Sequence, residues 1–212
     1  IAGKHLIEYP LIAAKKSKYI DKIIVSTDND SIINFVNKKK LFAPFKRPSK
    51  YSKNNSPASD VIIHALKWVE QKLNYEYDYI VYLEPTSPFT TSKDIDTALK
   101  SLFDNKNAKC IVSVTKSIRE HSVFNYKIDK NKMLIPQTKN KPKRRQDLNS
   151  EYYLDGSFYI SETNYYKKYK NFFTKNTMTQ IQEKFKSFEI DDEIDLICVS
   201  AIMKSNLYKN EK

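Results

Sequence analysis

Two acidic side chains, Glu189 and Asp191, lie two residues apart near the C-terminal end of the chain. In an extended segment, residues at that spacing project to the same side, so the two carboxylates would share one face. Carboxylate oxygens are ligands that Mg²⁺ binds in proteins. A second interpretation fits the same residues, in which Asp191 and Asp192 cap a helix that follows. The residues alone leave the metal site and the helix start both open.

The stretch EPTSP, residues 84–88, directly follows the apolar run Tyr79–Leu83. Its two prolines restrict the backbone, so the loop has a defined shape. In open parallel sheets, ligands bind beyond the carboxyl ends of the strands, where such a loop would lie. A rigid turn between a strand and a helix would have the same composition. The stretch is therefore a candidate binding loop, with the simple turn as the alternative.

Arginine is rare here, because only Arg47, Arg119, Arg144 and Arg145 occur among 37 basic residues. The planar guanidinium group suits carboxylates and phosphates. We therefore expect the arginines to meet anionic ligands. We also expect Arg47, the 84–88 loop and the two acids to converge at one edge of a sheet. Residues 139–146 carry consecutive cations without an apolar anchor, so this loop should be mobile when no ligand is bound.

The chain has a net charge of +12 and only two glycines. A basic chain raises the question of nucleic acid, and the stretch 139–146 would be its binding segment. The lysines are spread over the whole sequence, however, and tyrosine and phenylalanine lie mainly in predicted strands. We therefore expect no nucleic-acid binding. No apolar run approaches the roughly 18 residues of a membrane span, so no membrane association is expected, and two glycines cannot build a glycine-rich phosphate loop.

The elements that would position these residues alternate along the first half of the chain. Strand–helix–strand alternation is typical of an α/β fold with a mostly parallel sheet and helices on both faces. Ser56 and Pro57 predict the cap and first residue of one helix, and Asp28 or Asp30 the cap of another. We expect helices at 6–18, at 28 or 30 to 36, and at 56–73, 94–103 and 191–204. We expect strands at 22–26, 79–83, 109–115, 124–128, 133–135 and 152–160, with 184–190 as a further candidate.

The length fits a single domain over residues 1–212, with 120–180 as a lobe on it. The two cysteines, Cys110 and Cys198, each lie in an apolar run, which predicts buried thiols rather than a zinc site or a disulfide. A reducing, cytoplasmic location is consistent with them. The chain does not begin with methionine, so targeting signals ahead of Ile1 would not be visible.

Eight segments of this sequence occur in the order typical of one enzyme family. They are AGKHLI (2–7), KIIVSTD (22–28), FKRPSKYS (45–52), SPASDVIIHAL (56–66), YIVYLEPTSPF (79–89), IVSVT (111–115), RRQDLNSEYYLDGSFYI (144–160) and EIDDEIDL (189–196). With these segments the chain resembles the acylneuraminate cytidylyltransferases, which make CMP-sialic acids and related CMP-nonulosonates. The resemblance runs from Ile1 to about Leu196, so it covers nearly the whole chain.

The resemblance implies a Rossmann-like nucleotidyltransferase sheet with a small β-containing lobe through which family members commonly form homodimers. It implies a reaction in which the anomeric hydroxyl of an acidic sugar attacks the α-phosphate of CTP and pyrophosphate leaves. Mg²⁺ would be the cofactor, and Glu189 and Asp191 would be its ligands. These two acids, with Arg144 and Arg145, would form the catalytic set.

The remaining site residues are also implied by motif position. Arg47 matches the arginine that contacts cytosine or ribose, and Ser56 and Ala58 match the base-binding turn. Glu84, Pro85 and Thr86 match the family's LQPTSP loop. Arg144, Arg145 and Gln146 match the motif that meets the sugar acid or phosphate. Asp155 and Gly156 stand where the family has Asn-Gly.

Three departures from the family pattern stand out. Glu84 replaces a glutamine, and its carboxylate would repel phosphate unless protonated or paired. Glu189 replaces an aspartate and is one methylene longer. The family's first strand and its glycine-rich phosphate loop would precede AGKHLI and are not part of this sequence, so we expect weak CTP binding and slow turnover. The alternatives are a related sugar nucleotidyltransferase of the CMP-Kdo type and a non-catalytic nucleotide-binding remnant.

Overall fold

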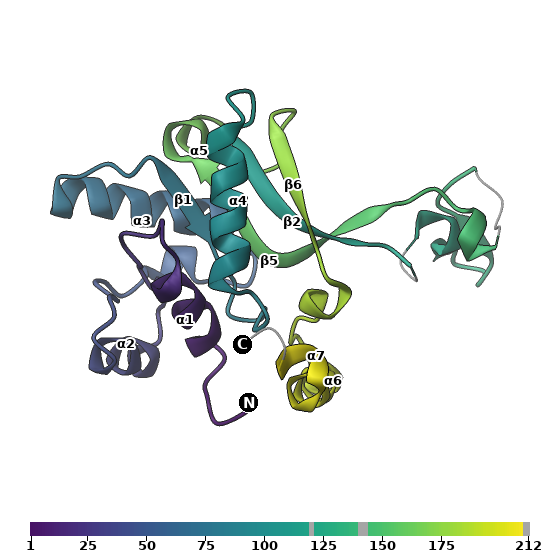
Figure 1. Ribbon diagram of the computed structural model, residues 1–212, viewed down its shortest axis with the longest axis horizontal. Helices are drawn as coiled ribbons and strands as arrows, with labels where there is room; N and C mark the ends of the chain where they lie inside the picture. Colours follow the sequence, from purple (N-terminus) through teal and green to yellow (C-terminus); the bar gives the residue numbers. More distant parts are fainter. Residues whose placement is uncertain (119–120, 140–143, 210–212) are drawn as a thin grey trace.

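The computed structural model describes residues 1–118, 121–139 and 144–209. Its centre is a four-stranded sheet in the order β1-β5-β2-β6 (Figure 1). The strands are β1 (Tyr79–Tyr82), β5 (Tyr152–Glu162), β2 (Cys110–Lys116) and β6 (Thr177–Gln182). The expected α/β class is therefore present, with helices packed on both faces of this sheet.

Alternate residues of β2 face two different cores. Ile111 packs with α4 (Ser92–Asp104), whose buried stripe includes Ile95 and Leu99, and with residues of α1 (Glu8–Lys16). Val112 packs on the other face against α3 (Ala58–Leu73) and α5 (Thr163–Tyr169). Because neighbouring side chains of a strand point to opposite faces, one apolar strand can serve both cores.

The prediction of a mostly parallel sheet is wrong. β5 runs antiparallel to both β1 and β2, and only β2 and β6 are parallel. The reason lies in the connection from β2 to β5, which leaves the sheet and returns to the same edge, so β5 comes back in the opposite direction. A parallel return would need a crossover to the far edge. Consequently the amino end of β5 lies at the same end of the sheet as the carboxyl ends of β1, β2 and β6. We call this end of the sheet the shared edge.

Several local predictions also differ from the structure. Residues 22–26 form no strand. Val25 N donates to Phe42 O at 2.9 Å, and an isolated bridge between Thr27 and Lys46 follows this extended segment. The predicted strand 184–190 is instead the turn η4 (Lys184–Ser187), and β6 was not predicted. β6 has alternating partly buried polar residues, so its pattern lacks the apolar contrast of an amphipathic strand.

The predicted helix caps are also partly wrong. The cap of α2 (Asp30–Lys38) is Asn29, whose side chain accepts from Ser31 N, rather than Asp28 or Asp30. α3 begins at Ala58 after Pro57 and has no side-chain cap. The remaining short elements are η1 (Ser49–Tyr51), α6 (Glu193–Lys204) and α7 (Asn206–Lys209).

The described residues between β2 and β5, which are 117–118, 121–139 and 144–151, project from the body, and we call them the arm (Figure 1). The arm contains η2 (Ser122–Phe124), the hairpin of β3 (Tyr126–Ile128) and β4 (Leu134–Pro136), and η3 (Arg145–Asp147). The hairpin pairs Tyr126 with Pro136 and Ile128 with Leu134. Directly paired residues share a face, so these four side chains form one apolar surface. In the single chain, all residues of both strands are exposed.

In the part of the chain that the structure describes, no helix combines the length and the apolar character that crossing a membrane requires.

Candidate active site

The 84–88 loop and the Glu189–Asp191 segment lie against each other at the shared edge of the sheet. Ile190 N donates to Thr86 O at 2.9 Å. The Ser87 hydroxyl lies 2.8 Å from Glu189 Oε1 and 3.1 Å from the carbonyl oxygen of Gly156. Ser87 is only 1% exposed, so these are interior contacts. Three segments far apart in the sequence thus meet near this edge, because β1 and β6 end there and β5 begins there.

Gly156 is the residue over which the Glu189 carboxylate lies. A Cβ atom added at Gly156 would overlap the Glu189 carboxylate, and the glycine has a φ of +68°. Both observations require glycine, since other residues rarely adopt this backbone conformation and here have no room for a side chain. The pairing of β2 with β5 is irregular between Val112 and Val114, close to this position. The sharp backbone turn at Gly156 therefore makes the space that Glu189 occupies.

Asp155, next to Gly156, is 1% exposed. Thr115 Oγ1 donates to its Oδ2 at 2.8 Å, and Ser157 N donates to its Oδ1 at 3.1 Å. A buried carboxylate needs such donors, because an unpaired charge in the interior is costly. Asp155 therefore holds the backbone on both sides of Gly156 in place.

We call Glu84, Glu189 and Asp191 the acid group. Burial is the largest cause that raises the pKa of Glu84, followed by the charges of Glu189 and Asp191. Burial also raises the pKa of Glu189, and the charges of Asp191 and Asp155 add to it although the Ser87 hydrogen bond opposes it. These carboxylates therefore repel one another, and a cation or a positively charged ligand would relieve the repulsion.

The helix-start interpretation explains Asp192 but not Asp191. Asp192 is the N-cap of α6, and its side chain accepts from Asp195 N in a capping box. The backbone N–H of Asp191 donates to Asp195 Oδ2 at 3.1 Å, while no side-chain partner of Asp191 occurs among the described residues. The carboxylate of Asp191 thus remains exposed and available.

The acid group suits Mg²⁺ by its chemistry. Mg²⁺ is held through one or two carboxylates together with substrate phosphates and water, rather than in an all-protein cage. In the described residues there is no group of three or more His, Cys, Asp or Glu side chains arranged as a metal cage. Glu189 and Asp191 are the residues that could hold the ion, with the remaining ligands supplied from outside the chain.

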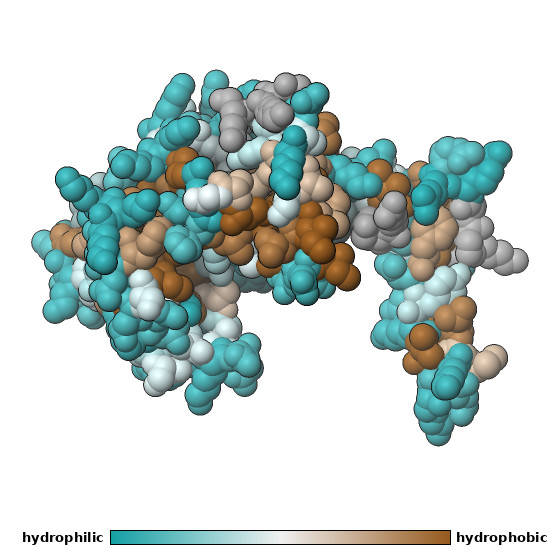
Figure 2. Space-filling model, turned by 90° about the horizontal axis from the view of Figure 1, so that it is seen from below, coloured by the Kyte–Doolittle hydropathy of each residue, from teal (hydrophilic) through white to brown (hydrophobic). Residues whose placement is uncertain are grey.

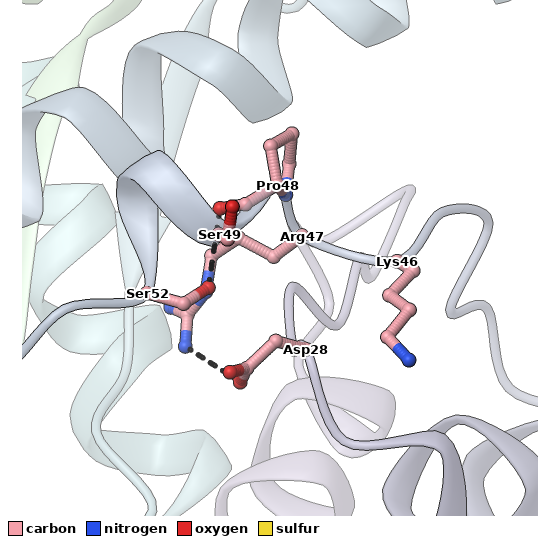
Figure 3. Close-up of a pocket in the computed structure, with 6 residues that line it drawn as sticks. All are labelled: Asp28, Lys46, Arg47, Pro48, Ser49 and Ser52. Atoms are coloured by element: carbon pink, nitrogen blue, oxygen red, sulfur yellow. Dashed lines mark hydrogen bonds and ion pairs between the residues drawn. The ribbon is translucent and has the colours of Figure 1, made fainter.

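Arg47 lies in a pocket of about 480 Å³ lined by Asp28, Lys46, Arg47, Pro48, Ser49 and Ser52 (Figure 3). Arg47 Nε donates to Ser52 Oγ at 3.1 Å, and its Nη2 lies 3.5 Å from Asp28 Oδ1. The guanidinium group is thus held on two sides. Burial raises the pKa of Tyr82, Glu84 raises it further and Arg47 lowers it, so both charges act on this one side chain. Tyr82 therefore lies within electrostatic range of both Glu84 and Arg47.

Ser56 lies in the loop that follows the Arg47 pocket and Ala58 at the start of α3, and neither residue lines the pocket. The Ser56 hydroxyl accepts from Lys53 N at 3.1 Å and donates to Lys50 O at 3.3 Å. Ala58 is the exposed first residue of α3. Ser56 therefore shapes the turn between the pocket and the helix.

Arg144, Arg145 and Gln146 lie on the arm and are exposed. Arg144 Nε donates to Asp147 Oδ2 at 2.8 Å, and the Arg145 guanidinium lies 5.9 Å from the Phe124 ring, also on the arm. The structure therefore does not bring these three residues to the acid group of the same chain. Arg119 and half of the predicted mobile loop, residues 140–143, lie outside the described residues.

Sequence reasoning missed four residues at these places, namely Asp28, Lys46, Ser52 and Ser87. Ser87 stands inside the loop that the sequence singled out, so its position was a usable signal. Asp28 orients Arg47 from a different segment, whereas Ser52 lies in the same segment 45–52 and could have been noted from the sequence.

The sequence matches the cytidylyltransferase family over residues 1–211. It is 27% identical over 211 residues to an N-acylneuraminate cytidylyltransferase of Escherichia coli O18:K1:H7, with 99% of this chain and 48% of that protein covered. It is 28% identical over 213 residues to a CMP-N,N'-diacetyllegionaminic acid synthase of Legionella pneumophila, with 97% and 88% covered. The fold is similar to that of a CMP:2-keto-3-deoxy-manno-octonic acid synthetase solved in complex with CTP, with a TM-score of 0.68, 13% identity, and 96% and 89% of the chains covered.

The chain spans about half the length of the E. coli relative and most of the length of the L. pneumophila relative. The likeness to the solved synthetase concerns the fold alone, because identity is low. The family match extends over nearly all residues and includes the loop, the arginine and the acids described above. The chain therefore belongs to the cytidylyltransferase family, which confirms the resemblance drawn from its motifs.

Proposed function

We propose that this protein transfers CMP from CTP to the anomeric hydroxyl of an acidic nonulosonic sugar and releases pyrophosphate. The observation that carries the proposal is the contact between the 84–88 loop and the Glu189–Asp191 segment. The hydrogen bonds from Ile190 N to Thr86 O and from Ser87 to Glu189 bring an acid pair to a loop at the edge of the sheet. This is where ligands bind in open α/β sheets.

The nucleotide base would occupy the Arg47 pocket. Asp28 and Ser52 hold the guanidinium group from two sides, so its donors are aimed before the ligand arrives. Ser56, in the loop that follows, and Ala58, at the start of α3, would contact the base. Glu84, Pro85 and Thr86 would border the phosphates and the sugar.

In the transfer, the sugar hydroxyl oxygen forms a bond to the α-phosphorus while the bond to the pyrophosphate oxygen breaks. Pyrophosphate takes the bonding electrons, and the hydroxyl proton leaves to solvent. Glu189 and Asp191 would hold Mg²⁺, which when bound neutralises phosphate charge. Ser87 and Gly156 fix the position of the Glu189 carboxylate, while the exposed carboxylate of Asp191 is free to adjust.

The arm supports a homodimer. Its hairpin shows one exposed apolar surface, with Ile128 69% and Leu134 65% exposed. A two-stranded hairpin without a covered face is at best marginally stable in water. In Figure 2 the arm stands apart from the body, with apolar side chains on both. A second copy would cover the hairpin, and its arm would carry Arg144, Arg145 and Gln146 toward the sugar or phosphates at the neighbouring acid group.

The test is pyrophosphate release from CTP and Mg²⁺ with a panel of acidic sugars. The panel contains sialic, legionaminic and pseudaminic acids and 2-keto-3-deoxy-manno-octonic acid. Release with one of the first three supports the proposal, and release only with the last makes the protein a synthetase of the CMP-Kdo type. If CTP binds but no sugar causes release, the non-catalytic alternative is correct.

A matched pair of variants links activity to the site. Glu189→Gln should reduce turnover by about 10²-fold or more, since it removes one proposed Mg²⁺ ligand without changing the side-chain volume. Glu183→Gln removes an exposed carboxylate from the same stretch of chain and should leave turnover unchanged. Equal activity of both variants would exclude Glu189 from the chemistry.

A further inference from the structure

A buried ion pair lies beside the acid group and takes no part in the proposed chemistry. Lys186 Nζ lies 2.9 Å from Asp94 Oδ1 and 3.1 Å from Asp94 Oδ2. The two residues are 5% and 8% exposed. Taking two charges out of water is costly, and such pairs can often be replaced by apolar residues without loss of stability. Stability alone is therefore a weak reason for this pair.

The pair connects the two segments that meet at the acid group. Asp94 is the third residue of α4, and it belongs to a capping box in which Thr91 N and Thr91 Oγ1 both donate to Asp94 Oδ2, at 2.9 and 2.7 Å. The 84–88 loop therefore runs directly into a helix start that Asp94 organises. Lys186 lies in η4, three residues before Glu189.

Besides the hydrogen bonds at the acid group itself, an apolar contact joins the same two segments. Phe89 and Phe185 pack edge to face with ring centroids 5.6 Å apart. Such an apolar contact tolerates small displacements, whereas a buried charge with both carboxylate oxygens in reach has one favoured position. The ion pair is thus the contact best suited to set how far Glu189 extends over Gly156 and toward Ser87.

We propose that Lys186 and Asp94 are positioning residues that hold the segment of the acid group in register with the 84–88 loop. The proposal rests on the proposed function for its consequence, since the held residues are the ones we assign to Mg²⁺. The register itself does not depend on the proposed function, because it is a property of the ligand-free protein.

The decisive variant is Lys186→Met combined with Asp94→Asn. It removes both charges at nearly constant volume, and the asparagine oxygen can still accept from Thr91 N. Two readouts are used: hydrogen exchange of the Ile190 amide without ligands, and the Mg²⁺ concentration for half-maximal pyrophosphate release. We expect exchange at Ile190 to accelerate at least about tenfold and the Mg²⁺ requirement to rise about 10–100-fold. The KM for CTP should change less, since the Arg47 pocket is untouched.

The control is Lys184→Met, which removes an exposed lysine from the same turn and should match the wild type in both readouts. A folded double variant with wild-type exchange at Ile190 and wild-type Mg²⁺ dependence would overturn the proposal. If the double variant does not fold, Lys186→Arg, which keeps the buried charge but changes its geometry, decides on the same readouts. If the wild type shows no turnover, the proposed function fails, while the exchange of Ile190 still decides the positioning role.

Discussion

The acid group and the arm are held in place in opposite ways. At the acid group, Ser87, Gly156 and Glu189 come from three different segments and contact one another inside the body. In the arm, the two ends of the segment are linked to each other, as by Ser122 N to Glu151 Oε2 at 2.8 Å and His121 Nε2 to Asn149 O at 3.0 Å. The apolar surface of its hairpin remains exposed.

This difference separates two kinds of preorganisation. The acid group is ordered by its own chain before a ligand arrives, so substitutions there should act on the isolated protein. The arm has apolar surface that none of the described residues covers, so we expect substitutions there to act through assembly.

The largest expected effect is that of Gly156→Ala at the centre of the acid group. The new methyl group would overlap the Glu189 carboxylate, and alanine would be strained at this φ. We expect a loss of about 10²–10³ in turnover and about 1–3 kcal/mol in the free energy of unfolding. Gly3→Ala is the control, because Gly3 has a φ of +76° and no atom within 4 Å of an added Cβ. Equal turnover losses in both would mean that strain, rather than contact with Glu189, causes the effect.

The next effect tests the arm. Ile128→Lys combined with Leu134→Lys places two like charges on the exposed hairpin surface. We expect the dimer dissociation constant to rise about 10–100-fold, measured by sedimentation over a range of concentrations. Lys127→Glu, on the opposite face of β3, should leave assembly unchanged. A wild-type protein that stays monomeric at all concentrations would contradict the assignment of the arm to assembly.

A smaller effect is expected at the Arg47 pocket. Arg47→Lys keeps the charge but loses the fork held by Ser52 and Asp28. The KM for CTP should rise about tenfold, with little change in kcat, because the interaction is made in the ground state as well. Lys46 lines the same pocket but pairs with the exposed Asp30, so Lys46→Gln serves as the comparison. If Lys46→Gln weakened CTP binding more than Arg47→Lys does, the pocket would bind CTP by charge alone.

The smallest effect concerns stability and pH. Burial and the neighbouring acids raise the pKa of Glu84, so the folded state binds a proton more tightly than the unfolded state. Stability should therefore fall as pH rises from the ordinary glutamate pKa through the raised one. Glu84→Gln has no carboxyl group to ionise at this position, so it removes this loss of stability. The variant should unfold at a higher temperature than the wild type at pH 7, and the two unfolding temperatures should become equal in acid. A difference that is independent of pH from 3 to 7 would show that Glu84 is not perturbed in this way.

Much of the fold follows from local patterns. Most helices, and the strands β1, β2 and β5, occur within a few residues of their predicted ranges, because their apolar runs and spacings set burial and element type. β6 was missed because its inward positions include Gln180 and the buried Gln182 while the apolar Ile181 is exposed, so the polarity of its residues does not indicate which face is buried. The segment 22–26 has strand composition, but a strand also requires a partner, and its hydrogen bonds here are few.

The sequence by itself determined the family, the α/β class and the residue types of the site, since these depend on motifs and on local periodicity. Only the tertiary structure decided the reversed direction of β5, the close approach of Glu189 to Gly156, the buried pair of Lys186 with Asp94, and the separation of Arg144 and Arg145 from the acid group. Each of these depends on residues far apart in the chain that meet through strand pairing and packing. A local pattern records which side chains prefer burial, but not which distant partner they meet, because that choice is made by the fold as a whole.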